Sequence, residues 1–227
     1  MSERRKARKH VGPPGRGLFV TGTGTEVGKT VVAAVLAHGA ARRGLRVTVF
    51  KPAVTGLDTP EVPDHEVIRA AAGSGQSDDE VAPYRYGPPV SPHLAADLAG
   101  AAIDPRWVQS AARAAADAGD YLVCEGVGGF LVPLTLGYLV RDFARHLGLP
   151  VAIAAAPGLG TINHTLLTVE AVRAVGLEVA AVVLTPWPDE PTEVERSNRE
   201  TIERLGDVRV QVIPRIDLSK PESWPGL

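Results

Sequence analysis

The stretch that most restricts the fold of this chain is residues 18–30, which read LFVTGTGTEVGKT. It begins with apolar and β-branched residues typical of a strand, passes through a turn of glycine and threonine, and ends where Gly28-Lys29-Thr30 opens a helix. Backbone N–H groups and a helix N-terminus would then face one point, which favours a bound anion such as phosphate. The stretch therefore predicts a phosphate-binding loop between a strand and a helix.

The side chains of this loop suit a nucleoside triphosphate. Lys29 can neutralise the β- and γ-phosphates, and the Thr30 hydroxyl can bind a magnesium ion. The spacing departs from the usual G-x-x-x-x-G-K-[ST] pattern, because five residues separate Gly22 from Gly28 and three separate Gly24 from it. A glycine-rich turn without a ligand is the alternative interpretation.

Composition and charge limit the class of protein. The chain has 227 residues, 44% hydrophobic and 22% charged, which fits one globular domain. The net charge of -2 gives no reason to expect nucleic acid binding, and the single cysteine, Cys124, excludes an intramolecular disulfide framework. No apolar run reaches the length of a membrane span. We expect a cytoplasmic protein with no nucleic acid or membrane partner.

Residues 1–17 are expected to form a disordered basic tail, because a run of lysine and arginine is followed by glycine and proline. No apolar segment follows the charges, so this start does not resemble a secretory signal. A nucleic-acid-binding arm is the alternative for the tail. We expect residues 18–227 to form a single α/β domain of the P-loop type.

From residue 18 onward, β-branched runs alternate with alanine-rich helical stretches, which predicts an α/β fold like that of P-loop NTPases. The sheet should be mostly parallel, with helices on both faces. Strands are expected near 18–22, 46–50, 120–125, 150–155, 178–184 and 208–213, and helices at 30–43, 105–118, 138–147, 163–175 and 192–205. Residues 57–92 are rich in proline, glycine and aspartate, and we expect a functional or disordered loop there.

Ligands of such sheets bind outside the carboxyl ends of the strands, so the residues that follow strands are candidates for the site. Lys51 follows the second strand, and Pro52 and Gly56 predict a tight loop that holds Lys51 and Thr55 near the phosphates. A solvated lysine is the alternative. Glu125 follows an apolar strand, where a carboxylate commonly reaches the magnesium ion of a phosphate-loop protein.

Two further candidates each have a plain structural alternative. Asp64 could complete the metal shell, or it could cap the helix that the following residues predict. Residues 151–164 again place a strand, a glycine turn and a helix start in succession, and such a helix start would suit a carboxylate. Asn163 and His164 could equally be capping and packing residues.

Together these segments closely resemble the dethiobiotin synthetase family over about residues 18–217. The segments that carry the resemblance, in the order of the family, are VTGTGTEVGKT, KPAVTG, SPHLAA beginning at Ser91, EGVGG and LGTINH. The resemblance implies an ATP-dependent cyclo-ligase of biotin biosynthesis. Its substrates would be 7,8-diaminopelargonate and CO2, and it would act through a carbamate and a carbamic-phosphoric anhydride to give dethiobiotin, ADP and phosphate.

The resemblance also implies roles for individual residues. Lys29 and Lys51 would be catalytic, Mg²⁺ would be held by Thr30, Asp64 and Glu125, and Thr55 would bind the carbamate or amine. The substrate carboxylate would be received by Gly160, Thr161, Ile162 and Asn163 of a partner subunit, so a homodimer is implied. The residues implied to contact the nucleotide are Glu26, Val27, Gly28, Lys29, Thr30, Val31, Asp64, Glu125, Gly126, Val127, Gly128, Thr185, Pro186, Ile213, Pro214 and Arg215.

The chain departs from the family pattern at two notable places. Gly24 stands where relatives carry aspartate, and Thr185 stands where an asparagine is expected to read the adenine. A threonine hydroxyl cannot present the paired donor and acceptor of an amide, so the resemblance alone does not imply a strict preference for ATP over other nucleoside triphosphates.

Three other functions fit the same architecture. A dimeric partitioning or maturation ATPase usually has an additional lysine early in the loop, and residues 23–27 contain none. A cobyrinate-type amide ligase needs a glutaminase domain, which we do not expect within this chain. A silent nucleotide-binding module would not need Lys29, Lys51 and Glu125 together.

Overall fold

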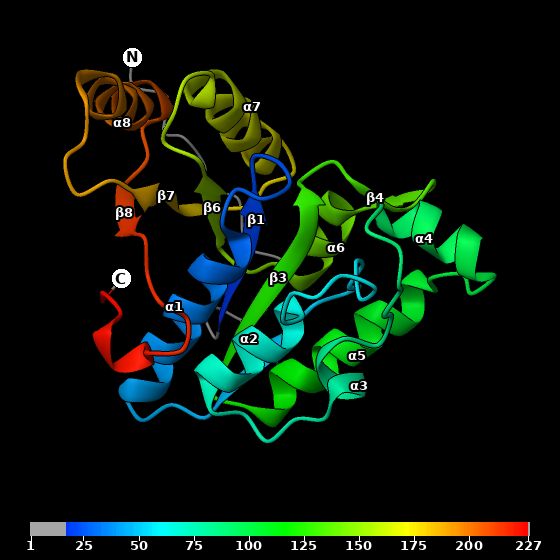
Figure 1. Ribbon diagram of the computed structural model, residues 1–227. Helices are drawn as coiled ribbons and strands as arrows, with labels where there is room; N and C mark the ends of the chain where they lie inside the picture. Colours follow the sequence, from blue (N-terminus) through cyan, green and yellow to red (C-terminus); the bar gives the residue numbers. More distant parts are fainter. Residues whose placement is uncertain (1–16, 227) are drawn as a thin grey trace, which may run out of the picture.

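Six parallel strands form the central sheet of the computed structural model, which describes residues 17–226 (Figure 1). The order of the strands across the sheet is β2-β3-β1-β6-β7-β8, and every neighbouring pair is parallel. The strands are β1 (Gly17–Gly22), β2 (Val47–Phe50), β3 (Tyr121–Gly129), β6 (Val151–Ala155), β7 (Val179–Trp187) and β8 (Val210–Pro214). The predicted mostly parallel α/β sheet is confirmed.

Helices cover both faces of this sheet, and two apolar clusters separate the faces. Val20 and Val123 pack with the helices of one face, α1 and α2, whereas their neighbours Phe19 and Cys124 pack with those of the other, α5 to α8. In Figure 1, α1 and α2 lie in front of the sheet. The helices are α1 (Lys29–Arg42), α2 (Asp64–Ala72), α3 (Asp78–Val81), α4 (Pro92–Ala99), α5 (Pro105–Ala118), α6 (Val140–Leu147), α7 (Thr161–Ala174) and α8 (Glu193–Gly206).

Some predicted boundaries are wrong. The strand expected to end at residue 125 continues to Gly129, because Gly129 pairs with Gly22 of β1 across an irregularity in the register. The helix expected from residue 138 begins at Val140, since residues 138–139 form β5 (Tyr138–Leu139), which pairs with β4 (Pro133–Thr135).

The region 57–92 is more regular than expected, because it contains α2 and α3 and leads into α4. Backbone hydrogen bonds also join this region to the chain just before it. The N–H of Val54 donates to the Tyr84 carbonyl at 2.8 Å, and the N–H of Tyr86 donates to the Val54 carbonyl at 2.9 Å. Each of these helices is short, with nine residues at most, so the sequence shows little helical periodicity.

The predicted tail lies outside the described residues except for Gly17, which is the first residue of β1 and pairs with Leu122. At the other end, a 3-10 turn (Pro221–Ser223) brings Trp224 onto α1. The Trp224 ring meets His38 edge-on at 5.4 Å, and its Nε1 donates to the Asp217 carbonyl at 2.8 Å. Within residues 17–226, every helix is too short or too polar to cross a membrane.

Candidate active site

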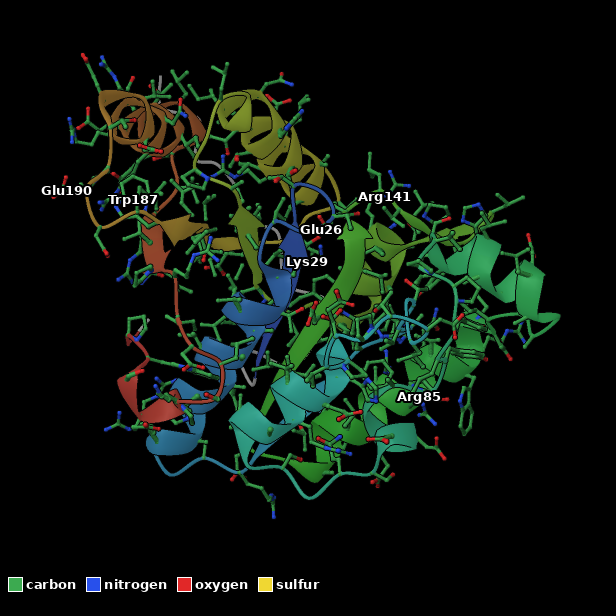
Figure 2. The ribbon with its side chains drawn as sticks, in the orientation of Figure 1. Glu26, Lys29, Arg85, Arg141, Trp187 and Glu190 are labelled. Carbon is green, nitrogen blue, oxygen red and sulfur yellow. The ribbon has the colours of Figure 1, made fainter. Side chains whose placement is uncertain are left out.

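The phosphate loop joins β1 to α1 and ends in a glycine with a left-handed backbone. Gly28 has φ 86° and precedes α1 without any side-chain cap, so the first N–H groups of the helix are not covered by a capping side chain. Lys29 follows directly, and its Nζ donates to the Gly24 carbonyl at 2.8 Å. Figure 2 shows Glu26 and Lys29 at this turn. Burial lowers the pKa of Lys29, although the nearby Glu125 opposes this shift.

Four side chains from four elements meet beside this loop. Lys51, directly after β2, donates from Nζ to Asp64 Oδ2 and to Glu125 Oε1, both at 2.6 Å. The Thr30 hydroxyl on α1 donates to Asp64 Oδ1 at 2.8 Å and is also within 3.1 Å of Glu125 Oε1. Two carboxylates, one ammonium and one hydroxyl therefore form a single hydrogen-bonded cluster at the carboxyl ends of the strands.

The cluster includes two charges in the interior of the protein. Lys51 is 2% exposed and Glu125 is fully buried. Burial would lower the pKa of Lys51, but Glu125 and Asp64 raise it. Burial raises the pKa of Glu125, and Lys51 offsets only part of this effect. Burial would also raise the pKa of Asp64, but its bonds to Lys51 and Thr30 lower it. Each buried charge depends on its partner.

Asp64 does not cap its helix. The N-cap of α2 is Pro63, and Asp64 is the first helical residue. Its carboxylate bonds to Thr30 and Lys51 instead. The structure thus brings together Thr30, Asp64 and Glu125, the three residues implied to hold a metal.

The cluster can accommodate a magnesium ion. Glu125 Oε2 is buried and has no hydrogen-bond partner, so one carboxylate oxygen is uncommitted. No group of three or more His, Cys, Asp or Glu residues able to hold a metal occurs within residues 17–226. Magnesium commonly needs only one or two carboxylates, because water and substrate phosphates complete its octahedron. Two carboxylates and a hydroxyl match that requirement.

A cavity of about 680 Å³ opens over the cluster. Its far wall comes from the loop after β2 and the segment before α4, which are joined by backbone hydrogen bonds from Gly56 to Pro88 at 3.1 Å and from Leu57 to Tyr86 at 3.2 Å. The residues that line it are Thr25, Glu26, Gly28, Lys29, Thr30, Val31, Lys51, Thr55, Gly56, Thr59, Glu61, Asp64, Pro89, Val90, Ser91, Pro92, Glu125, Val127, Gly128 and Val132.

Most residues expected in the phosphate and metal regions line this cavity, and some expected nucleotide contacts do not. Gly126 faces Phe19 and Val140, where an added Cβ would be 3.0 Å from Val140. Ile213 is buried in the core, so its side chain cannot reach a ligand there. The expected contacts that are not part of the cavity wall are Val27, Gly126, Thr185, Pro186, Ile213, Pro214 and Arg215.

Thr185 is buried against the phosphate loop. A Cβ added to Gly28 would lie 2.4 Å from Thr185 Cγ2, so the threonine methyl fills the space beside this glycine. Thr185 therefore contacts the loop through its apolar end and supports the left-handed residue at the start of α1.

Four polar residues of the cavity wall had no role in the predicted site: Thr25, Thr59, Glu61 and Ser91. Ser91 had a signal, because it opens the SPHLAA segment. Thr59 and Glu61 had none, since they lie in the irregular stretch after β2, where no periodicity shows which side chains face inward.

The second helix start, between β6 and α7, lies outside this cavity. Gly160 precedes α7 with φ 88° and no side-chain cap, as Gly28 does for α1. Asn163 and His164 are exposed, and Leu159 is 97% exposed. Within one chain, residues 160–163 are thus not brought to the Lys51 cluster.

Comparison with known proteins connects this site to a family. The chain is 44% identical over 190 residues to ATP-dependent dethiobiotin synthetase BioD of Anaeromyxobacter dehalogenans strain 2CP-1, an alignment that covers 84% of this chain and 85% of the relative. The chain belongs to the dethiobiotin synthetase family. The family enzyme of Rhodococcus erythropolis is 44% identical, with 84% of each chain covered, and that of Bacillus subtilis strain 168 is 36% identical, with 86% and 85% covered.

Broader comparisons concern the fold of this chain. A family model described as an AAA domain matches residues 16–223. The septum site-determining protein MinD of Pyrococcus horikoshii, solved with Mg-ADP, superposes with a TM-score of 0.54 at 16% identity, covering 88% of this chain and 81% of MinD. Chloroplast FtsY of Physcomitrella patens superposes with a TM-score of 0.56 at 17% identity, and the match covers 92% of this chain and 62% of FtsY. At such identities the likeness concerns the fold alone.

Proposed function

We propose that the protein is an ATP-dependent dethiobiotin synthetase, which joins 7,8-diaminopelargonate and CO2 and closes the ring of dethiobiotin with release of ADP and phosphate. The observation that carries the proposal, beside the family, is the Lys51 ammonium held 2.6 Å from both Asp64 and Glu125 next to the phosphate loop. A ligase of this kind must bring anionic groups together, and a buried cation at the strand edge supports that task.

The metal of the reaction would be held by Thr30, Asp64 and Glu125. Bound Mg²⁺ would supply a positive charge that neutralises the oxygens of the transferred phosphoryl group. The uncommitted Glu125 Oε2 supports this assignment, since a buried carboxylate oxygen without a partner is costly unless a ligand satisfies it.

The side chains of the chain divide the remaining work. Lys29 is placed at the start of α1 to neutralise the terminal phosphates, and Lys51 lies where it can bind both the γ-phosphate and a carbamate. The Thr55 hydroxyl lines the same cavity and can hydrogen-bond the carbamate or the amine. Ring closure then needs mainly orientation and exclusion of water, because both reacting groups belong to one molecule.

The carboxylate of the substrate would bind at the start of α7 from a partner subunit, so the active form would be a homodimer in the cytoplasm. Two features support this arrangement. The uncapped N-terminus of α7 after Gly160 suits an anion, and Leu159 is almost wholly exposed in one chain.

The decisive experiment measures phosphate and dethiobiotin together. Phosphate release should require Mg²⁺, bicarbonate and the diamine, in amounts equal to the dethiobiotin formed. Rapid hydrolysis that ignores the diamine would favour a switch ATPase and contradict the proposal. Replacing ATP by CTP or GTP in the same assay tests whether the Thr185 environment restricts the base.

Mixing two inactive variants tests the shared site. Lys51→Ala and Asn163→Ala damage different halves of the proposed site, so a mixed dimer would contain one intact site. Equal amounts of the two variants, mixed and allowed to exchange subunits, should recover roughly a quarter of the wild-type activity if sites are shared across a twofold dimer. Recovery of no activity would contradict a carboxylate site from the partner.

A further inference from the structure

Ser91 occupies the N-cap position of α4, but its side chain does not cap the helix. A serine at this position normally accepts a hydrogen bond from a backbone N–H of the first turn. Ser77 does so at the start of α3, where it accepts from the N–H of Glu80. The Ser91 hydroxyl lies instead 3.1 Å from Nδ1 of His93. This serine is therefore paired with an imidazole rather than with the backbone of its helix.

Ser91 is the member of the pair that belongs to the site. Ser91 lines the cavity that also contains Lys51 and Thr55, whereas His93 is not part of the cavity wall. The main chain at Ser91 is fixed, because its carbonyl accepts from the N–H of Ala95 at 2.9 Å and the next residue, Pro92, is buried. Ser91 therefore lines the cavity as a residue and contacts the imidazole through its hydroxyl.

The proposed reaction needs a proton acceptor at this place. An amine that forms a bond to the carbamate carbon must lose a proton. Asp64 and Glu125 are hydrogen-bonded to Lys51 and Thr30, and both lysines of the site are donors. The remaining oxygen of Glu125, Oε2, is the one assigned to the metal. Imidazole is the side chain that most often acts as a general base, and His93 Nδ1 lies 3.1 Å from the Ser91 hydroxyl.

We propose that Ser91 and His93 form a proton-accepting pair for the amine that closes the ring, an inference that rests on the proposed function. The amine nitrogen forms a bond to the carbon of the carbamic-phosphoric anhydride, and the bond from that carbon to the phosphate oxygen breaks, so phosphate leaves with the electron pair. The amine proton passes to Ser91 Oγ while the Ser91 hydroxyl proton passes to His93 Nδ1. The imidazolium then releases its proton to solvent.

Several other titratable groups lie near this pair. The strand packed against α4 is β4, which contains no titratable residue. Tyr86 shares the apolar cluster beneath α4, and burial raises its pKa to about 12, so it stays neutral between pH 6 and 9. On α4 itself the titratable residue besides His93 is Asp97. The charged residues of the cavity wall are Glu26, Lys29, Lys51, Glu61, Asp64 and Glu125.

The test compares His93→Gln and Ser91→Ala with the wild type across pH 6 to 9. At pH 8 each variant should lose about 10²-fold in kcat, while its KM for ATP is unchanged. The ratio of wild-type to variant rates should fall toward one at the acid end of this range, because a proton acceptor no longer assists the reaction once it is protonated. The double variant should lose no more than either single variant.

Controls separate this role from a structural one. Because the Ser91 hydroxyl does not cap α4, Ser91→Ala should leave the thermal midpoint unchanged, whereas Ser77→Ala, which removes a true cap, should lower it. His146→Gln, outside the cavity, should retain full activity at every pH.

The outcomes distinguish this inference from the proposed function. Wild-type protein that makes no dethiobiotin overturns the proposed function, and this inference with it. If the wild type is active but both variants keep its kcat, the proton-accepting pair alone is overturned. The same conclusion follows if both variants lose the same factor in kcat at every pH.

Discussion

The chain contains two versions of one local design, and only one of them lies within the charged site. Both β1–α1 and β6–α7 lead from a strand through a left-handed glycine, Gly28 or Gly160, into a helix without a side-chain cap. The first is surrounded by Lys51, Asp64 and Glu125. The second is exposed to solvent within one chain.

The neighbouring strands explain the difference. In the order β2-β3-β1-β6-β7-β8, the strands on one side of β1 end at Lys51 and contain Glu125, so their charges converge on the first helix start. The strand beyond β6 is β7, which contains the buried Thr185 and no charged residue. A helix N-terminus thus offers only a modest attraction for anions, and the adjoining strand ends determine whether it becomes a catalytic site.

The largest expected effect comes from removing the central cation. Lys51→Ala should lower kcat by about 10³-fold and leave the affinity for ATP within severalfold, because the ammonium acts on the reacting groups. Steady-state kinetics and nucleotide titration measure the two quantities. Lys220→Ala, at the exposed surface, is the matched control. Equal losses in kcat and affinity would assign Lys51 to nucleotide binding alone.

Lys51→Ala should also report on stability. It leaves Glu125 buried beside Asp64 without its hydrogen-bonded counter-charge, and breaking a buried pair costs about 3–5 kcal/mol. The pKa of Lys51 is raised and that of Asp64 is lowered in the folded protein, so their pairing favours the charged forms of both. Urea unfolding at pH 7 measures the loss, and a loss below that of Lys220→Ala would contradict the pairing.

The two glycines give a direct comparison of the two helix starts. Gly28→Ala should reduce the free energy of unfolding by about 3 kcal/mol, because it adds left-handed strain and a contact of 2.4 Å with Thr185 Cγ2. Gly160→Ala has the same strain but meets nothing closer than 4.0 Å, so it should cost only about 1 kcal/mol. Equal losses in the free energy of unfolding for the two variants, measured in urea, would show that Thr185 does not pack against Gly28.

A second substitution sharpens this result. Thr185→Ser removes the methyl group that an alanine at position 28 would meet. In the Gly28→Ala background it should restore about 1–2 kcal/mol, although it should slightly destabilise the wild type by leaving a small gap. The double-variant cycle measures the coupling, and additive effects would contradict a direct contact.

The smallest expected effect on stability is that of Leu159→Ser. The side chain is 97% exposed, so the free energy of unfolding of one chain should change by less than about 0.5 kcal/mol. If a partner covers this residue, the KM for the diamine should rise and the dimer should weaken in light scattering. Unchanged kinetics and mass would contradict the proposed partner surface.

Much of this architecture followed from the sequence because strand and helix periods and the loop at residues 18–30 are local signals. The edge of the sheet at which Lys51 and Glu125 appear also followed, since parallel strands end on one side. The pairing of Lys51 with both Asp64 and Glu125 did not, because it depends on how the irregular segment after β2 folds back. The strand conformation of residues 126–129 was missed for a similar reason, since three glycines favour a turn unless a neighbouring strand pairs with them.

The Trp224 contact with His38 has a practical consequence for anyone handling this protein. The last described residues brace the middle of the helix whose first turn bears Lys29 and Thr30. A purification tag or truncation near Trp224 would therefore disturb its packing against α1, the helix that follows the phosphate loop. Loss of activity in such a preparation should first be compared with that of Trp224→Ala, which removes the same contact, before it is assigned to the catalytic residues.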